Sequence, residues 1–270
     1  MHSKLICMSP ICLAIRLVPL WICVSVHFWG GARPSRARTL QRLATYGFSV
    51  SSFKRSPVVL LTHMFVHLDD SHLLQNMMAL AAVQVNLGGP CPKWSSVKKH
   101  AWATIKQTAG ALLVMIVGGA IGVGGQLLFL DVKIRQAAYR IVGPPESVRQ
   151  FLPEGIEDWM NAVIYQAQKL MNSIAHSRHN QVKTNSVICG CSAGVAALVG
   201  FGAVYRKTYT SFVCIVPDLL EVVARLQTEL ASMFDFRVAP DVSVGHAGHV
   251  GGFVAGVVMG TFWSFICKNA

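Results

Sequence analysis

Long apolar runs constrain the fold of this chain more than any other feature. Several stretches contain roughly 20 or more mostly apolar residues, the length that an α-helix needs to cross a bilayer. Only 13% of the 270 residues are charged, about half the share found in an ordinary soluble domain. We therefore expect an all-α, polytopic membrane protein rather than a large soluble core.

The apolar runs predict six membrane spans, at residues 5–30, 58–87, 107–130, 187–205, 209–230 and 242–266. The fifth segment is interrupted by Asp218 and Glu221, and we interpret it as a short or tilted span with a polar face toward protein. Residues 131–183 are polar and predict an extramembrane insertion with one amphipathic helix near 156–174. The chain then divides into residues 1–57, with the first span and a basic loop, and a core at 58–270.

Charge and cysteine usage exclude several classes of protein. The net charge is +12, and its position in loops and near the N-terminus indicates membrane-flanking charge, with no nucleic-acid binding. The acid-free N-terminal region resembles a mitochondrial targeting segment, but a loop touching lipid headgroups explains it equally well. The mitochondrial inner membrane and the secretory-pathway or plasma membrane therefore both stay open. None of the eight cysteines shows a CxxC spacing, so neither a disulfide framework nor a zinc finger is expected.

Polar side chains gather at one end of three of the predicted spans. They are His63, His67, His72 and Asn76 at the start of the second span, Ser192 within Gly190-x-Ser192-x-Gly194 at the start of the fourth, and His246 and His249 in the sixth. His72 and Asn76 are four residues apart and share one helix face. The predicted topology places this pair, Ser192 and His249 at the same end of the bundle, where we expect them to form one site.

These residue types fit acyl transfer by a serine nucleophile. A serine hydroxyl needs a base within hydrogen-bond reach and donors aimed at the developing oxyanion. His249 can act as the base, and His72, Asn76 and the backbone N–H of Ser192 can act as the donors. The second, fourth and sixth spans hold no acidic residue beyond their ends, so a Ser-His dyad is expected rather than a triad.

Taken together, these motifs resemble the rhomboid family of intramembrane serine proteases. The matching residues are His67-x-x-x-x-His72-x-x-x-Asn76, Gly190-x-Ser192-x-Gly194 and His249-x-Gly251-Gly252-x-x-x-Gly256. The resemblance runs from the second span to the C-terminus, excluding the insertion, and implies a six-transmembrane-helix rhomboid-like bundle. It also implies cleavage of single-pass transmembrane protein substrates in the lipid bilayer. Ser192 would be the nucleophile, His249 the general base, and His72 with Asn76 would stabilise the oxyanion.

Some features depart from the family pattern and leave alternatives open. Many relatives carry an aromatic residue four positions after the serine, where this chain has Ala196. A catalytically inactive rhomboid-like protein that binds transmembrane clients for trafficking or translocation is one alternative. A small-ion or metal transporter using the histidines is another, although His63 and His67 lack a third ligand. We expect no metal and no cofactor, and the Gly251-Gly252 spacing favours His249 over His246 as the base.

Overall fold

The computed structural model describes residues 10–29, 35–87, 97–140, 186–227 and 245–269, with isolated helical positions between 165 and 184. Over these residues the secondary structure is helical, and the one pairing of extended backbone is an isolated bridge between Phe48 and Ile188. The predicted all-α class is therefore confirmed.

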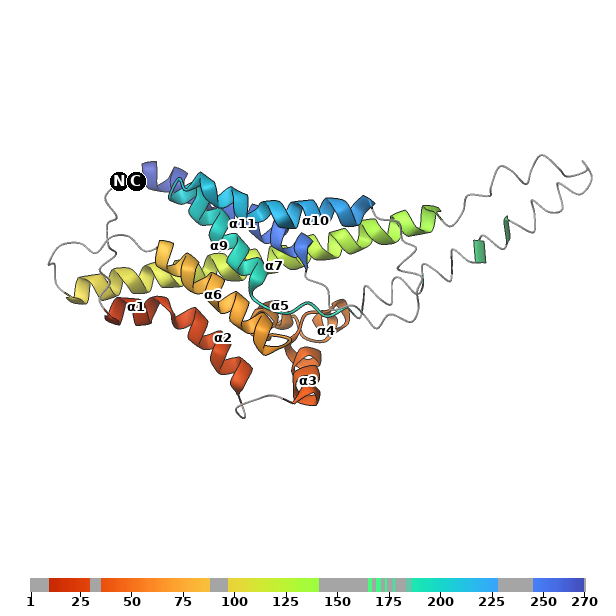
Figure 1. Cartoon of the computed structure of the whole chain (residues 1–270), viewed down its shortest axis with the longest axis horizontal. Coiled ribbons are helices and arrows are strands. Elements are labelled where there is room, and N and C mark those ends of the chain that lie inside the picture. Colours follow the sequence, from red (N-terminus) through yellow and green to blue (C-terminus); the bar gives the residue numbers. More distant parts are fainter. Residues whose placement is uncertain are drawn as a thin grey trace, which may run out of the picture.

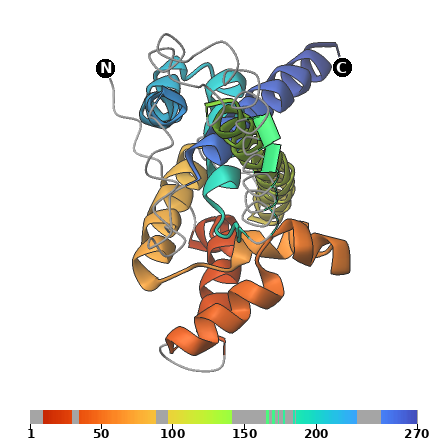
Figure 2. The same ribbon diagram turned by 90° about the vertical axis from the view of Figure 1, so that its right-hand side faces the viewer.

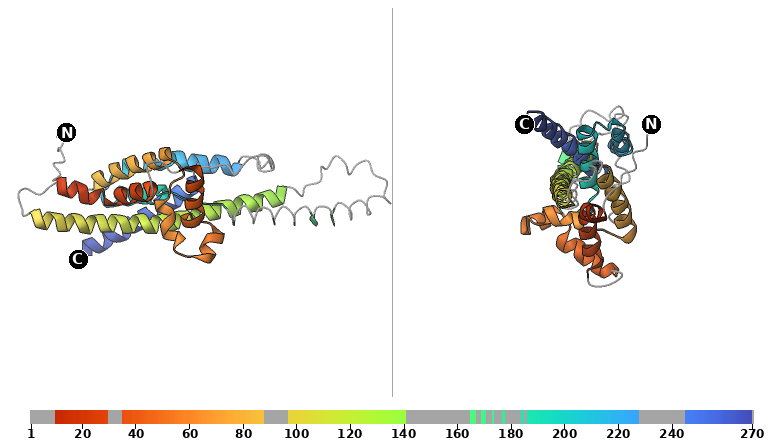
Figure 3. Two further views of the ribbon diagram at one scale, coloured as in Figure 1. Left: turned by 90° about the horizontal axis from the view of Figure 1, so that it is seen from below. Right: turned by 90° about the vertical axis from the view of Figure 1, so that its left-hand side faces the viewer.

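Three helices form the centre of the molecule (Figure 1): α7 (Val97–Arg140), α9 (Ser192–Tyr205) and α11 (His246–Asn269). They pack against one another in all three pairings, and α7 runs along the length of the molecule (Figure 3). A side chain at Gly252 or Gly256 would overlap the backbone carbonyls of Ala193 and Ala197. Small residues at such spacing let two helix backbones touch, so α9 and α11 meet in close contact.

The predicted first span is a bent pair of helices, α1 (Pro10–Arg16) and α2 (Val18–Phe28), with a 56° change of direction. Pro19 lies in the first turn of α2, where its missing N–H and fixed φ favour a new helix start. Arg16 lies at the bend and is buried. Its guanidinium donates to the backbone carbonyl of Gln84 at 3.5 Å and to the Gln107 side chain at 3.2 Å.

The predicted second span is not one helix. Its first part is α5 (Val59–Thr62) followed by a 3₁₀ turn, η1 (His63–Phe65), and a new helix, α6 (Asp70–Leu87), starts after a break. The Asp69 carboxylate accepts the backbone N–H of His72 at 2.7 Å, which satisfies one of the free donors at a helix start. His63 and His67 therefore lie before α6, whereas His72 lies on it.

The predicted first loop contains two helices, α3 (Arg36–Tyr46) and α4 (Val50–Arg55). After α9 the chain forms η3 (Tyr209–Ile215) and α10 (Val216–Gln227). An end view shows α3 and α4 on the opposite side of the molecule from α10 (Figure 2). The 12 residues of α10 extend only about 18 Å, less than the hydrocarbon thickness of about 30 Å.

Two of the described helices are long and apolar enough to cross a bilayer, at 100–132 within α7 and 246–266 within α11, and the bent α1–α2 pair makes a third if it counts as one span. The predicted six spans are thus not reached over the described residues. The 14-residue α9 is apolar but short. Because α7 continues to Arg140, the first ten residues of the predicted insertion belong to this helix. The amphipathic helix expected near 156–174 lies largely outside the described residues.

Candidate active site

Ser192 is the first residue of α9, and an extended segment leads into it. Phe48 and Ile188 exchange both backbone hydrogen bonds, at 2.9 and 2.7 Å, and the N–H of Gly190 donates to the His63 carbonyl at 2.9 Å. Gly190 has a φ of +93°, which favours glycine. A Cβ there would lie 2.7 Å from Cε1 of His72. The first glycine of the Gly-x-Ser-x-Gly motif is thus required by both backbone conformation and space.

Two buried histidines contact this segment. Nε2 of His67 lies 3.7 Å from the thiol sulfur of Cys191, and Nδ1 of His63 donates to the Val59 carbonyl at 3.2 Å. We call His63, His67 and Cys191 the nucleophile cradle. His63 thus hydrogen-bonds to backbone. The alternative of a metal pair at His63 and His67 has no support in the described part of the chain, where the candidate metal ligands that converge lie elsewhere.

His72 and Asn76 lie on α6 with their side chains against Gly190. A Cβ at Gly190 would be 2.9 Å from Nε2 of His72 and 3.5 Å from Nδ2 of Asn76. Asn76 is only 7% exposed, and its Nδ2 has no hydrogen-bond partner among the described residues. Leaving a buried amide unpaired costs free energy. The amide lies against Gly190, which precedes Ser192 by two residues.

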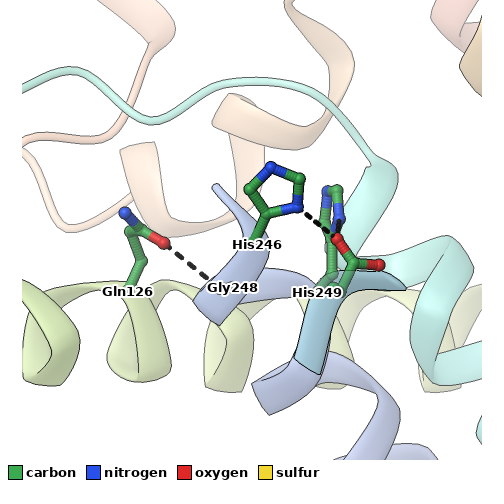
Figure 4. A network of polar contacts seen from close by, with 5 residues as sticks. Gln126, His246, Gly248 and His249 are labelled. Atoms are coloured by element: carbon green, nitrogen blue, oxygen red, sulfur yellow. Dashed lines mark hydrogen bonds and ion pairs between the residues drawn. The ribbon is translucent and has the colours of Figure 1, made fainter. Parts of the chain in front are cut away.

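The predicted base, His249, lies in the first turn of α11 (Figure 4). One carboxylate oxygen of Asp218, Oδ1, accepts from Nδ1 of His249 at 2.9 Å and from Nδ1 of His246 at 2.6 Å. We call these three residues the base cluster. Burial alone would raise the pKa of Asp218, but the hydrogen bonds from the two imidazoles outweigh it, so the pKa lies below its usual range. A proton held on Nδ1 of His249 leaves Nε2 as the basic nitrogen.

Asp218 is a site residue that the sequence prediction missed. The expectation of a dyad rested on the absence of acids in the second, fourth and sixth spans, and Asp218 comes from the fifth segment. It lies 31 residues before His249, so no helical spacing connects the two. The available signal was a carboxylate directly after Pro217 in an otherwise apolar stretch, which was interpreted only as a polar face.

The helices bring the neighbours of Ser192 and His249 to one point on α7. A Cβ at Gly122 would lie 2.6 Å from Cβ of Ala193 and 2.7 Å from the carbonyl oxygen of Gly248. Over the described ranges, the Ser192 hydroxyl has no hydrogen bond to His249 or to another side chain. Catalytic hydrogen bonds are often long without substrate and tighten when it binds.

Residues 152–265 match the family model described as the rhomboid domain. This match covers less than half of the 270 residues and supports a rhomboid domain in this part of the chain. The rhomboid match includes Ser192, Asp218 and His249, whereas His72 and Asn76 precede it. No curated protein and no solved structure matches the chain.

The rhomboid-domain match narrows the class of protein. Together with helices long and apolar enough to cross a bilayer, the rhomboid domain indicates an integral membrane protein. The family contains intramembrane proteases and inactive relatives, and the match supports either of these.

Proposed function

We propose that this chain is a multi-pass intramembrane serine-type endopeptidase that cleaves transmembrane segments of single-pass membrane proteins. The observation that carries the proposal is the position of His72 and the unpaired Asn76 amide against Gly190, two residues before Ser192. Hydrogen-bond donors beside a serine at a helix start are what acyl transfer needs.

In the proposed reaction, Oγ of Ser192 attacks the scissile carbonyl carbon while Nε2 of His249 takes the hydroxyl proton. The C–N bond then breaks, and His249 returns the proton to the leaving amine. Water hydrolyses the acyl-enzyme by the same steps. Asp218 is a positioning residue, because its bond to Nδ1 sets the tautomer and orientation of His249 and stabilises the imidazolium that forms.

The negative oxygen of the tetrahedral intermediate requires donors that are already in place. Nδ2 of Asn76, the His72 side chain and the Ser192 backbone N–H are proposed for this role. One such donor contributes about 3 kcal/mol to transition-state stabilisation in a serine hydrolase. Nδ2 of Asn76 has no hydrogen-bond partner among the described residues, so it loses no bond to them when the intermediate forms.

The test compares the wild type with Ser192→Ala in proteoliposomes that contain a single-pass transmembrane substrate. We expect cleavage, and labelling by a fluorophosphonate, in the wild type and neither in the variant. Ser264→Ala is the matched control, because this serine lies on α11 about 22 Å from His249 along the helix. Cleavage that survives in Ser192→Ala would refute the assignment.

The same experiment separates the second candidate, an inactive rhomboid-like protein that binds transmembrane clients. Two observations favour that candidate: Ser192 has no side-chain hydrogen bond over the described residues, and Ala196 stands where many relatives carry an aromatic residue. It predicts no fluorophosphonate labelling of the wild type, together with binding of a transmembrane peptide.

A further inference from the structure

His246 has no part in the proposed proteolysis, yet it contacts the same carboxylate oxygen as His249. Orienting a base takes one hydrogen bond from one acid. Here two imidazoles, three residues apart on α11, converge on one oxygen of Asp218 from α10. The second imidazole, that of His246, therefore needs a separate explanation.

We propose that Asp218, His246 and His249 also form a binding site for a divalent transition-metal ion, with Zn²⁺ as the best match, and that the bound ion switches the protease off. The metal site rests on the geometry of the three side chains. The switch rests in addition on the proposed function.

The separations of the three ligand atoms suit a metal ion of this size. One ring nitrogen of each histidine and one Asp218 oxygen all lie within 4.8 Å of one another, and the two contacts from Nδ1 to Oδ1 measure 2.6 and 2.9 Å. With bonds of 2.0–2.2 Å, a tetrahedral ion holds its ligand atoms roughly 3.3 Å apart. Each contact has to lengthen by less than about 1 Å for an ion to replace the shared protons.

The ligand types and their exposure to solvent also fit a Zn²⁺ site. Two imidazoles and one carboxylate, with a fourth position for water, form a common Zn²⁺ site. The side chains of Asp218, His246 and His249 are 19%, 23% and 17% exposed, so an ion can reach them and a water can complete the shell. Between the histidines, the Gly248 N–H donates to Oε1 of Gln126 at 3.2 Å (Figure 4), which fixes this turn of α11.

An ion at this position would disable His249 as a base. The metal takes Nδ1, which removes the hydrogen bond to Asp218. The neutral ring then carries its one proton on Nε2, which has no lone pair left to accept another. His249 could not accept the Ser192 proton, so we expect the metal-bound enzyme to be inactive.

The first arm of the test measures metal binding without proteolysis. Co²⁺ is titrated into the purified full chain in detergent micelles, and its ligand-field absorption reports the site. We expect saturation at one ion per chain and displacement by Zn²⁺. Asp218→Asn and His246→Asn alter different helices, and each should weaken Co²⁺ binding by at least about tenfold, with thermal unfolding as the check that both variants fold.

Asp70→Asn is the matched control for metal binding. Asp70 accepts from Nε2 of His27 at 2.9 Å, a carboxylate–imidazole contact of the same length without a third ligand. Co²⁺ binding should be unchanged in this variant. Absence of saturable Co²⁺ binding, or equal binding in the wild type and both site variants, would overturn the metal site.

The second arm measures cleavage. Zn²⁺ should inhibit the wild type, EDTA should restore activity, and His246→Asn should resist Zn²⁺ when normalised to its own metal-free rate. Full activity at saturating metal overturns the switch. A chain without any cleavage activity refutes the proposed function and the switch together, while the Co²⁺ titration still decides the metal site.

Discussion

The nucleophile cradle and the base cluster use the same residue type in different environments. His63 and His67 in the cradle are each 1% exposed, and their polar contacts are to a backbone carbonyl and to the thiol of Cys191. His246 and His249 in the base cluster are partly exposed and share one carboxylate.

The two environments suit different roles: the cradle suits structural support, and the base cluster suits chemistry. A fully buried imidazole fills space and holds its neighbours, because charging it away from water is costly. A partly exposed imidazole next to a carboxylate can gain and lose protons, or bind an ion, without that penalty. We therefore expect changes in the base cluster to affect catalysis, and changes in the cradle to affect stability.

The largest catalytic effect after loss of Ser192 or His249 is expected for Asp218→Asn. Loss of the carboxylate removes the acceptor that holds His249 in the productive tautomer, and kcat should fall roughly 10²–10³-fold, less than for a fully buried triad acid. KM and the free energy of unfolding should change little. Cleavage is measured in metal-free buffer across pH, since a merely structural role would leave the pH profile unchanged.

Asp70→Asn is again the matched control for this prediction, because it breaks a His–carboxylate contact outside the base cluster. Equal losses of kcat in Asp218→Asn and Asp70→Asn would contradict a catalytic effect specific to the base cluster.

Asn76→Ala should lower kcat by roughly 10²-fold with little loss of stability. The Asn76 amide is proposed to bind the oxyanion, and one such donor accounts for about 3 kcal/mol in the transition state. In the free enzyme Nδ2 has no partner over the described residues, so its removal breaks no hydrogen bond there. Single-turnover cleavage and thermal unfolding are measured together.

Gln84→Ala is the control on the same helix. Its Nε2 is likewise buried without a partner in the described structure, but it lies two turns farther along α6. We expect kcat to be unchanged in this variant. A loss of kcat like that of Asn76→Ala would attribute the effect to helix packing.

The smallest catalytic effect is expected in the cradle. His67→Ala leaves a cavity under the Ser192 segment and removes the contact to Cys191, which should lower the free energy of unfolding by about 2–4 kcal/mol. Among molecules that remain folded, the pH dependence of cleavage should match the wild type. Denaturant titration of His67→Ala and His246→Ala compares the regions directly, since the partly exposed His246 should cost less than about 1 kcal/mol.

Local spacing predicted the part of the site that depends on one helix. The i, i+4 relation placed His72 and Asn76 on one face. This follows from helix geometry alone, so no knowledge of distant partners was needed.

Features set by contacts between distant segments could not be predicted in this way. The partnership of Asp218 with His249 depends on how α10 docks on α11. The break before α6 depends on the pairing of Gly190 with the His63 carbonyl, more than 120 residues apart. Residues 66–69 at the break include the polar His67 and Asp69, but the apolar residues on both sides led hydropathy alone to predict one span over 58–87.

The close contact between α9 and α11 limits how these two helices can move. At Gly252 and Gly256 the two backbones are separated by no side chain, and closely packed interiors resist compression and sliding. α9 and α11 must therefore move as a single rigid body. Any rearrangement that the proposed cleavage needs for a substrate to reach Ser192 has to occur in a more loosely held element. α10, which packs mainly on α11 and η3, carries Asp218 with it when it moves.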